Sequence, residues 1–267
     1  MKKLALAIAA TSVLGMGAAQ ATQIQIDASG ILGAVAGTYQ TDYFNRMTFN
    51  TFSPTSTYID DDGVAGVTTG DTVLDSGFAT VGNLNPLSFP GSNFGGFGSV
   101  WGMNVDWELE GVTQVVGADF LGVFNSGTVN FNICDAMNVC TTALSLDVIG
   151  SSLGVPGGGS VGIEVFGRVT FAYAETFYDE FGRDFAQTLL DSEIIWGFAN
   201  SDIFGIGNVP EFAGVNDDGF DTYTRTTTLP SVDVSFQVPE PTSVAILGVG
   251  LLGMGFAARR RRNNKAA

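Results

Sequence analysis

The chain has 267 residues, a formal net charge of −16, no histidine and two cysteines. Without histidine, Ser-His-Asp and Cys-His catalysis and the usual histidine-ligated zinc sites cannot be assembled. The negative charge repels phosphate backbones and excludes nucleic acid as an expected partner. Carboxylates are the catalytic groups that remain. We expect the protein not to be an enzyme, with a carboxylate-dependent glycosidase as the weaker alternative.

The first 21 residues have the pattern of a secretory signal peptide. Two lysines precede an apolar run over residues 4–16, and Ala19 and Ala21 form an A-x-A cleavage pattern. A buried helix would not explain the small residues or the abrupt change to alternating polar sequence. We therefore expect export and a mature chain that begins at Thr22.

Residues 22–237 are expected to form the exported domain, and period-two alternation dominates them. In residues 101–110, the odd positions from Trp101 to Leu109 are apolar and the even positions are mostly polar, which predicts a half-buried strand. Clusters of Gly, Asn, Asp and Ser separate several such runs. The pattern predicts a mainly β fold, either an antiparallel β-sandwich-like domain or a barrel-like one.

Two acidic loops are candidate calcium sites. Closely spaced carboxylates and amides around a turn glycine offer the oxygen ligands that calcium prefers. Neither loop fits the EF-hand pattern, and Asp-Gly turns explain the same residues without an ion. The candidate ligands are Asp60, Asp61, Asp62, Asn216, Asp217, Asp218 and Asp221.

Cys134 and Cys140 are the only cysteines, and the runs on both sides of them alternate. In an exported chain, two cysteines at close spacing favour a disulfide, here at the turn of a hairpin. Free thiols or a redox pair are the alternatives.

Residues 175–191 depart from the strand pattern. Phe177, Phe181, Phe185 and Leu189 recur every fourth residue with charged residues between them. This spacing predicts one short amphipathic helix in an otherwise β domain.

The tail, residues 238–267, has three parts in a fixed order. They are Pro239, Glu240 and Pro241; an apolar, glycine-rich run over residues 244–258; and Arg259, Arg260, Arg261 and Arg262. As a helix the apolar run would span about 22 Å, less than the roughly 30 Å hydrocarbon core. The arginines can extend toward the headgroups and hold the end of the chain in the cytoplasm. These features predict a temporary membrane anchor.

This order of motif, short membrane segment and arginine cluster resembles the PEP-CTERM sorting signal of Gram-negative bacteria. The resemblance covers about the last 30 residues and implies that exosortase recognises Pro239, Glu240 and Pro241 and cuts near them. The protein is then a substrate, inserted transiently in the inner membrane and delivered to the cell surface or extracellular matrix. Whether sorting releases the domain or attaches it stays open.

The function of the exported domain is inferred mainly from this resemblance. Some PEP-CTERM proteins are similar to flocculation-associated surface proteins, which implies a structural or adhesive role in biofilm or floc formation with exopolysaccharide. The alternative is a carbohydrate-binding β-sandwich that uses loop calcium and Trp101, Trp107 or Trp196.

Overall fold

The computed structural model describes residues 23–85, 94–116, 119–154, 162–190, 193–198, 209–226 and 232–237. The chain divides into two compact units, residues 1–237 and 238–267. All of the described residues belong to the first unit. The expected signal peptide, sorting motif, membrane segment and arginine cluster lie outside them. Within the described residues there is no helix of sufficient length and apolar character to span a membrane.

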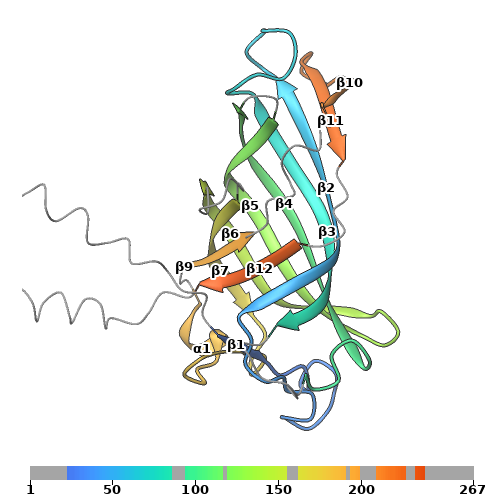
Figure 1. Cartoon of the computed structure of the whole chain (residues 1–267), viewed down its shortest axis with the longest axis vertical. Helices are drawn as coiled ribbons and strands as arrows, with labels where there is room; N and C mark the ends of the chain where they lie inside the picture. Colours follow the sequence, from blue (N-terminus) through green and yellow to red (C-terminus); the bar gives the residue numbers. More distant parts are fainter. Residues whose placement is uncertain are drawn as a thin grey trace, which may run out of the picture. The chain divides into compact units, whose positions relative to one another are not determined.

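Ten of the described strands form one antiparallel sheet, and two short strands form another (Figure 1). The large sheet has the order β10-β11-β2-β12-β9-β7-β6-β5-β4-β3. Its strands are β2 (Arg46–Asp60), β3 (Thr72–Asn85), β4 (Trp101–Val116), β5 (Asp119–Asp135), β6 (Cys140–Gly154), β7 (Gly162–Ala172), β9 (Glu193–Phe198), β10 (Glu211–Val215), β11 (Asp221–Thr226) and β12 (Val232–Gln237). The small sheet pairs β1 (Ile24–Ile26) with β8 (Phe177–Asp179).

The large sheet closes on itself because β2 also pairs with β3 over nearly its whole length. The ring contains β2, β3, β4, β5, β6, β7, β9 and β12, in chain order. On its other edge β2 has two partners: β12 pairs with residues 46–49, and β11 pairs with residues 55–60. The prediction of a mainly β, antiparallel domain is confirmed. The eight strands of the ring form one closed sheet, not two separate sheets packed face to face.

The inward face of the closed sheet forms the core. In β4, Trp101, Met103, Val105, Trp107 and Leu109 are each at most 6% exposed, so the alternation predicts their common burial correctly. The Trp107 ring also stacks on Phe52, with centroids 5.0 Å apart. Beside it in β3 stands a residue without a side chain, Gly77. A Cβ atom there would lie 2.1 Å from the Trp107 ring, so this position requires glycine.

The segment predicted to be helical, residues 175–191, forms only one turn of helix in its described part. That turn is α1 (Phe185–Thr188), whose N-terminus is capped by the Asp184 carboxylate. The preceding residues form β8 and a tight turn, in which Gly182 has φ +73° and the Asp179 carboxylate accepts the backbone N–H groups of Phe181 and Arg183. Side chain-to-backbone bonding of this kind competes with a continuous helix. The helix prediction is therefore wrong over residues 175–184.

Candidate functional site

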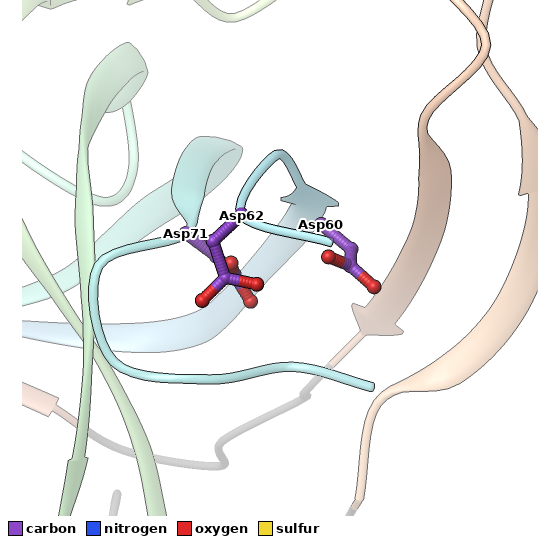
Figure 2. A group of neighbouring side chains, drawn as sticks. All are labelled: Asp60, Asp62 and Asp71. Atoms are coloured by element: carbon purple, nitrogen blue, oxygen red, sulfur yellow. The ribbon is translucent and has the colours of Figure 1, made fainter. Parts of the chain in front are cut away.

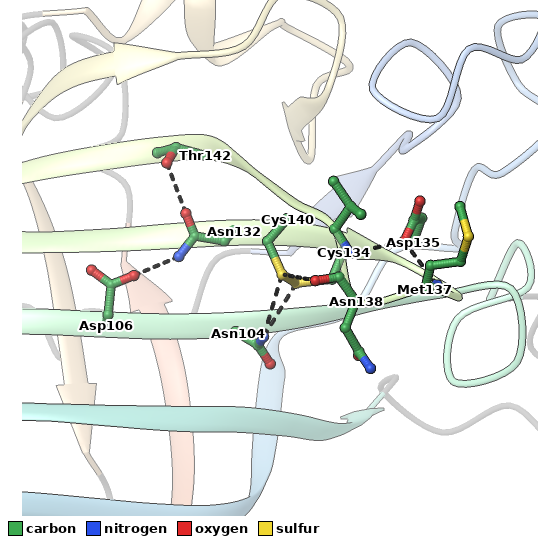
Figure 3. The surroundings of a disulfide bond; sticks show 10 residues. Asn104, Asp106, Asn132, Cys134, Asp135, Met137, Asn138, Cys140 and Thr142 are labelled. Atoms are coloured by element: carbon green, nitrogen blue, oxygen red, sulfur yellow. Dashed lines mark hydrogen bonds between the residues drawn. A yellow bond between two sulfur atoms is a disulfide. The ribbon is translucent and has the colours of Figure 1, made fainter.

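The β5–β6 hairpin contains the predicted disulfide, and the structure confirms it (Figure 3). Cys134 and Cys140 are directly opposite in the register of the two strands. Between them, the Asp135 carboxylate accepts the backbone N–H groups of Met137 and Val139 at 2.8 and 2.9 Å. The turn is thus closed by a covalent bond and by hydrogen bonds from its own residues.

A network of polar side chains continues from this hairpin along the outward face of β4, β5 and β6 (Figure 3). The two carboxylate oxygens of Asp106 accept the side-chain amides of Asn130 and Asn132 at 2.9 and 2.5 Å. The amide oxygens accept in turn from the hydroxyls of Ser145 and Thr142, both at 2.8 Å. Each amide is therefore held in one orientation from both ends.

The register of the strands extends this network into one row across β3 to β7. Phe78 is paired with Asp106, Asp106 with Asn130, Asn130 with Ser145, and Ser145 with Phe171. The two phenylalanines at the ends of the row are 48% and 43% exposed. We call this row, with its flanking exposed rings, the outer polar row.

The tryptophans considered for carbohydrate contact do not lie on this face. Trp101 and Trp107 are 2% and 3% exposed and point into the core. Their indole N–H groups are also occupied, by the carbonyl of Gly95 and the carboxylate of Asp75. The prediction that these two rings contact a glycan is wrong, and the side chain of Trp196 lies outside the described residues.

At the other end of the closed sheet, the β2–β3 loop gathers three carboxylates (Figure 2). Oxygens of Asp60, Asp62 and Asp71 lie within 4.8 Å of one another. Asp60 ends β2 and Asp71 immediately precedes β3, so the hairpin brings them together across its base. Figure 2 shows the carboxylates of Asp62 and Asp71 close together and that of Asp60 across from them. We call these three residues the acidic cluster.

Asp71 is the member of the acidic cluster that the sequence pattern did not identify as a candidate calcium ligand. Its side chain is fully buried; Oδ2 accepts the N–H of Thr68 at 2.6 Å, whereas Oδ1 has no hydrogen-bond partner. Burial raises the pKa of Asp71 above its ordinary value, and the negative charges of Asp62, Asp60 and Asp61 raise it further. Recognition of residues 46–60 and 72–85 as one hairpin would have predicted that Asp71 lies near Asp60.

The remaining predicted calcium ligands have other positions. The Asp61 carboxylate accepts the Thr72 hydroxyl at 2.8 Å, outside the acidic cluster. Asn216, Asp217 and Asp218 form the β10–β11 turn, in which the Asn216 side chain accepts the N–H groups of Asp218 and Phe220. Asp221 follows this turn and is paired with Asp60 in the register of β11 and β2. The two predicted loops therefore meet at one edge of the sheet.

A separate carboxylate, that of Asp75, lies inside the closed sheet. It accepts the Trp107 indole N–H at 2.7 Å and the Ser56 hydroxyl at 2.6 Å. Burial raises the pKa of Asp75, while these two hydrogen bonds and the Arg225 charge lower it. Glycoside hydrolysis requires a pair of carboxylates. The acidic side chains of β4, Asp106, Glu108 and Glu110, are on the opposite, outward face.

Comparison with known families identifies the tail. Residues 237–262 match the model of the PEP-CTERM protein-sorting motif, so the chain carries this motif at the position that the sequence predicts. The motif indicates a protein that exosortase processes and that is exported to the cell surface. Comparison with curated proteins and with solved structures found no match.

Proposed function

We propose that this PEP-CTERM protein, after sorting, is a non-enzymatic structural or adhesive component of the extracellular matrix that contacts exopolysaccharide in biofilms or flocs. The observation that carries the proposal is the outer polar row. The row crosses five strands on the outward face of the sheet. It combines fixed amides and a carboxylate with exposed aromatic rings.

The chemistry of the row suits a polysaccharide. Sugar hydroxyls bind amides and carboxylates, and the apolar faces of sugar rings pack on aromatic side chains. Because Asn130 and Asn132 are already held in place by Asp106, Ser145 and Thr142, little side-chain entropy is lost when a ligand binds. With strands about 4.8 Å apart, the five-strand row extends about 19 Å, which suits an extended chain better than a single sugar.

Co-sedimentation of the full-length protein with exopolysaccharide from the producing cells tests this contact. Replacement of both end rings, Phe78→Ser with Phe171→Ser, should lower the bound fraction at least fivefold without unfolding the protein, because both rings are exposed. Phe220→Ser is the matched control, since Phe220 is similarly exposed, at 41%, in the β10–β11 turn. Equal binding by all variants would contradict the role of the row.

The matrix role itself requires a test in cells. Deletion of the gene should reduce cell aggregation, and the wild-type chain should restore it while the double variant Phe78→Ser with Phe171→Ser should not. A deletion strain that aggregates normally in every growth phase would overturn the matrix role.

The second candidate is a carbohydrate-binding module, which the same outer row favours. A module binds a short oligosaccharide of defined sequence, whereas a matrix component is required for aggregation. A glycan array in which one oligosaccharide binds at micromolar concentration, together with normal aggregation of the deletion strain, would favour the module.

The route to the surface is also part of the proposal. The signal peptide is expected to be removed after Ala21, and exosortase to cut near Pro239, Glu240 and Pro241 after transient insertion of residues 244–258 in the inner membrane. The intact mass of the surface protein tests both cuts. A mass that retains Arg259 and the following arginines would identify a protein that stays anchored in the inner membrane.

A further inference from the structure

The acidic cluster concentrates negative charge where β2 and β3 join their connecting loop. Asp60 and Asp71 are 7% and 0% exposed, so water screens their repulsion poorly. In the described part of the chain, no lysine or arginine forms an ion pair with any of the three carboxylates. An acidic cluster alone is common on protein surfaces and identifies no ligand.

A buried hydroxyl next to the cluster, that of Thr113, provides the independent observation, together with one oxygen of Asp71 itself. Asp71 Oδ1 and Thr113 Oγ1 are both buried without a hydrogen-bond partner, and the two side chains are 0% and 1% exposed. The residues are neighbours across β3 and β4, because the N–H of Thr113 donates to the carbonyl of Asp71 at 2.7 Å. A buried oxygen without a hydrogen-bond partner destabilises the folded chain, so a ligand that both oxygens can bind is expected here.

The β10–β11 hairpin brings a further carboxylate, outside the acidic cluster, opposite Asp60 in the strand register. Asp221 of β11 is paired with Asp60 of β2, and like charges directly opposite in a sheet destabilise the pairing. This hairpin is attached to the closed sheet through β11 and residues 55–60 of β2. A cation bound beside Asp60 would neutralise the repulsion and hold the hairpin against the sheet.

We propose that Asp60, Asp62 and Asp71 bind one Ca²⁺ ion, with the Thr113 hydroxyl as a further oxygen ligand, and that this ion fixes the β10–β11 hairpin to β2. The ligands are hard oxygens with three negative charges, which suits Ca²⁺. Ca²⁺ also accepts irregular arrangements of six to eight oxygens completed by water, whereas Mg²⁺ requires a near-octahedral set. The proposal concerns an edge of the sheet remote in register from the outer polar row and goes beyond the proposed function.

Isothermal titration of the full-length chain in detergent with CaCl₂, after removal of metal, tests the site. We expect saturable binding of one ion, with MgCl₂ at least tenfold weaker. Asp71→Asn and Asp62→Asn should each weaken binding at least tenfold. The exposed position of Asp62 keeps the test valid if the Asp71 variant does not fold.

Asp61→Asn and Asp217→Asn are the matched controls, because each removes the same charge from the same two loops outside the acidic cluster. Asp217→Asn should bind Ca²⁺ as the wild type does, and Asp61→Asn, whose charge acts on Asp71 from outside the cluster, should weaken binding much less than Asp62→Asn. No saturable binding, or equal weakening by all four substitutions, would overturn the site. The second result would show a diffuse attraction between Ca²⁺ and an acidic surface.

Hydrogen exchange of residues 209–226 tests the link to the hairpin. Ca²⁺ should slow exchange there in the wild type and leave it unchanged in Asp62→Asn. Exchange that Ca²⁺ does not alter in the wild type would overturn the link. Polysaccharide binding by Asp62→Asn distinguishes this proposal from the previous one, since loss of the ion site should leave the outer polar row able to bind.

Discussion

Two hairpins at opposite ends of the closed sheet differ in the chemistry that holds their connecting loops. The β5–β6 hairpin is closed by a disulfide, and the Asp135 carboxylate is satisfied by two backbone N–H groups. The β2–β3 hairpin is longer and gathers Asp60, Asp62 and Asp71 with one buried oxygen left without a partner. The first is complete without a ligand, whereas the second has the composition of a site that requires one.

The largest expected effect is loss of the disulfide. Replacement of both Cys134 and Cys140 by serine should lower the free energy of unfolding by about 2 kcal/mol, because a closed loop this short restricts the unfolded chain only modestly. Urea unfolding of the full-length chain measures the change. Calcium affinity at the far hairpin should be unaltered, and a parallel loss there would show that the two ends are not independent.

The next effect is the change in stability caused by Asp71→Asn, and its sign should depend on calcium. The pKa of Asp71 is raised, so the folded state binds a proton on the Asp71 carboxylate more tightly than the unfolded chain does. The stability that protonated Asp71 contributes at low pH is therefore lost as the pH rises through the raised pKa. In metal-free buffer, Asp71→Asn should therefore gain stability relative to the wild type between pH 4 and pH 7. With saturating CaCl₂ at pH 7 it should be the less stable protein.

Thermal unfolding at both pH values, with and without CaCl₂, measures this reversal. The double cysteine variant is the control, because its loss of stability should depend on neither pH nor calcium. An Asp71→Asn variant less stable than the wild type in metal-free buffer at pH 7 would contradict the charge repulsion.

A smaller effect should come from the backbone of the acidic hairpin. Gly63 has φ +76° and no atom near its missing Cβ, so Gly63→Ala should cost about 1 kcal/mol from the backbone alone. Gly102→Ala is the matched control, since Gly102 also has open space but lacks a positive φ. Urea unfolding that gives equal costs at the two positions would contradict the backbone explanation.

These two hairpins also show how far the sequence predicts the molecule. Local signals sufficed for the disulfide hairpin, because both cysteines and the alternating flanks are adjacent in the chain. The acidic cluster was predicted only in part: Asp60 and Asp62 were identified from their spacing, but Asp71 is brought in by strand pairing. The meeting of Asp60 with Asp221 depends on β11 pairing with β2, which no local pattern specifies.

The misassigned residues have a similar explanation. The i, i+4 spacing of Phe177, Phe181 and Phe185 predicted one helix, yet Phe177 is buried from strand β8, Phe181 is 63% exposed, and only Phe185 lies in the helical turn α1. The spacing shows only which residues are apolar. The conformation is decided by the hydrogen bonds from the backbone N–H groups of Phe181 and Arg183 to the Asp179 carboxylate. Alternation in β4 predicted burial of Trp101 and Trp107, which is incompatible with their use as surface contacts.

The smallest expected effect returns to the disulfide hairpin. Asn138 has φ +59° in its turn, a conformation that asparagine tolerates better than most residues and that glycine adopts freely. Asn138→Gly should therefore raise the free energy of unfolding by about 0.5 kcal/mol, and Asn138→Ala should lower it by a similar amount. Urea unfolding of the wild type and the two variants measures the order of their stabilities. In the double cysteine variant the same order should persist, because the turn is also held by Asp135; an order that vanishes with the disulfide would show that the covalent bond alone imposes the left-handed conformation.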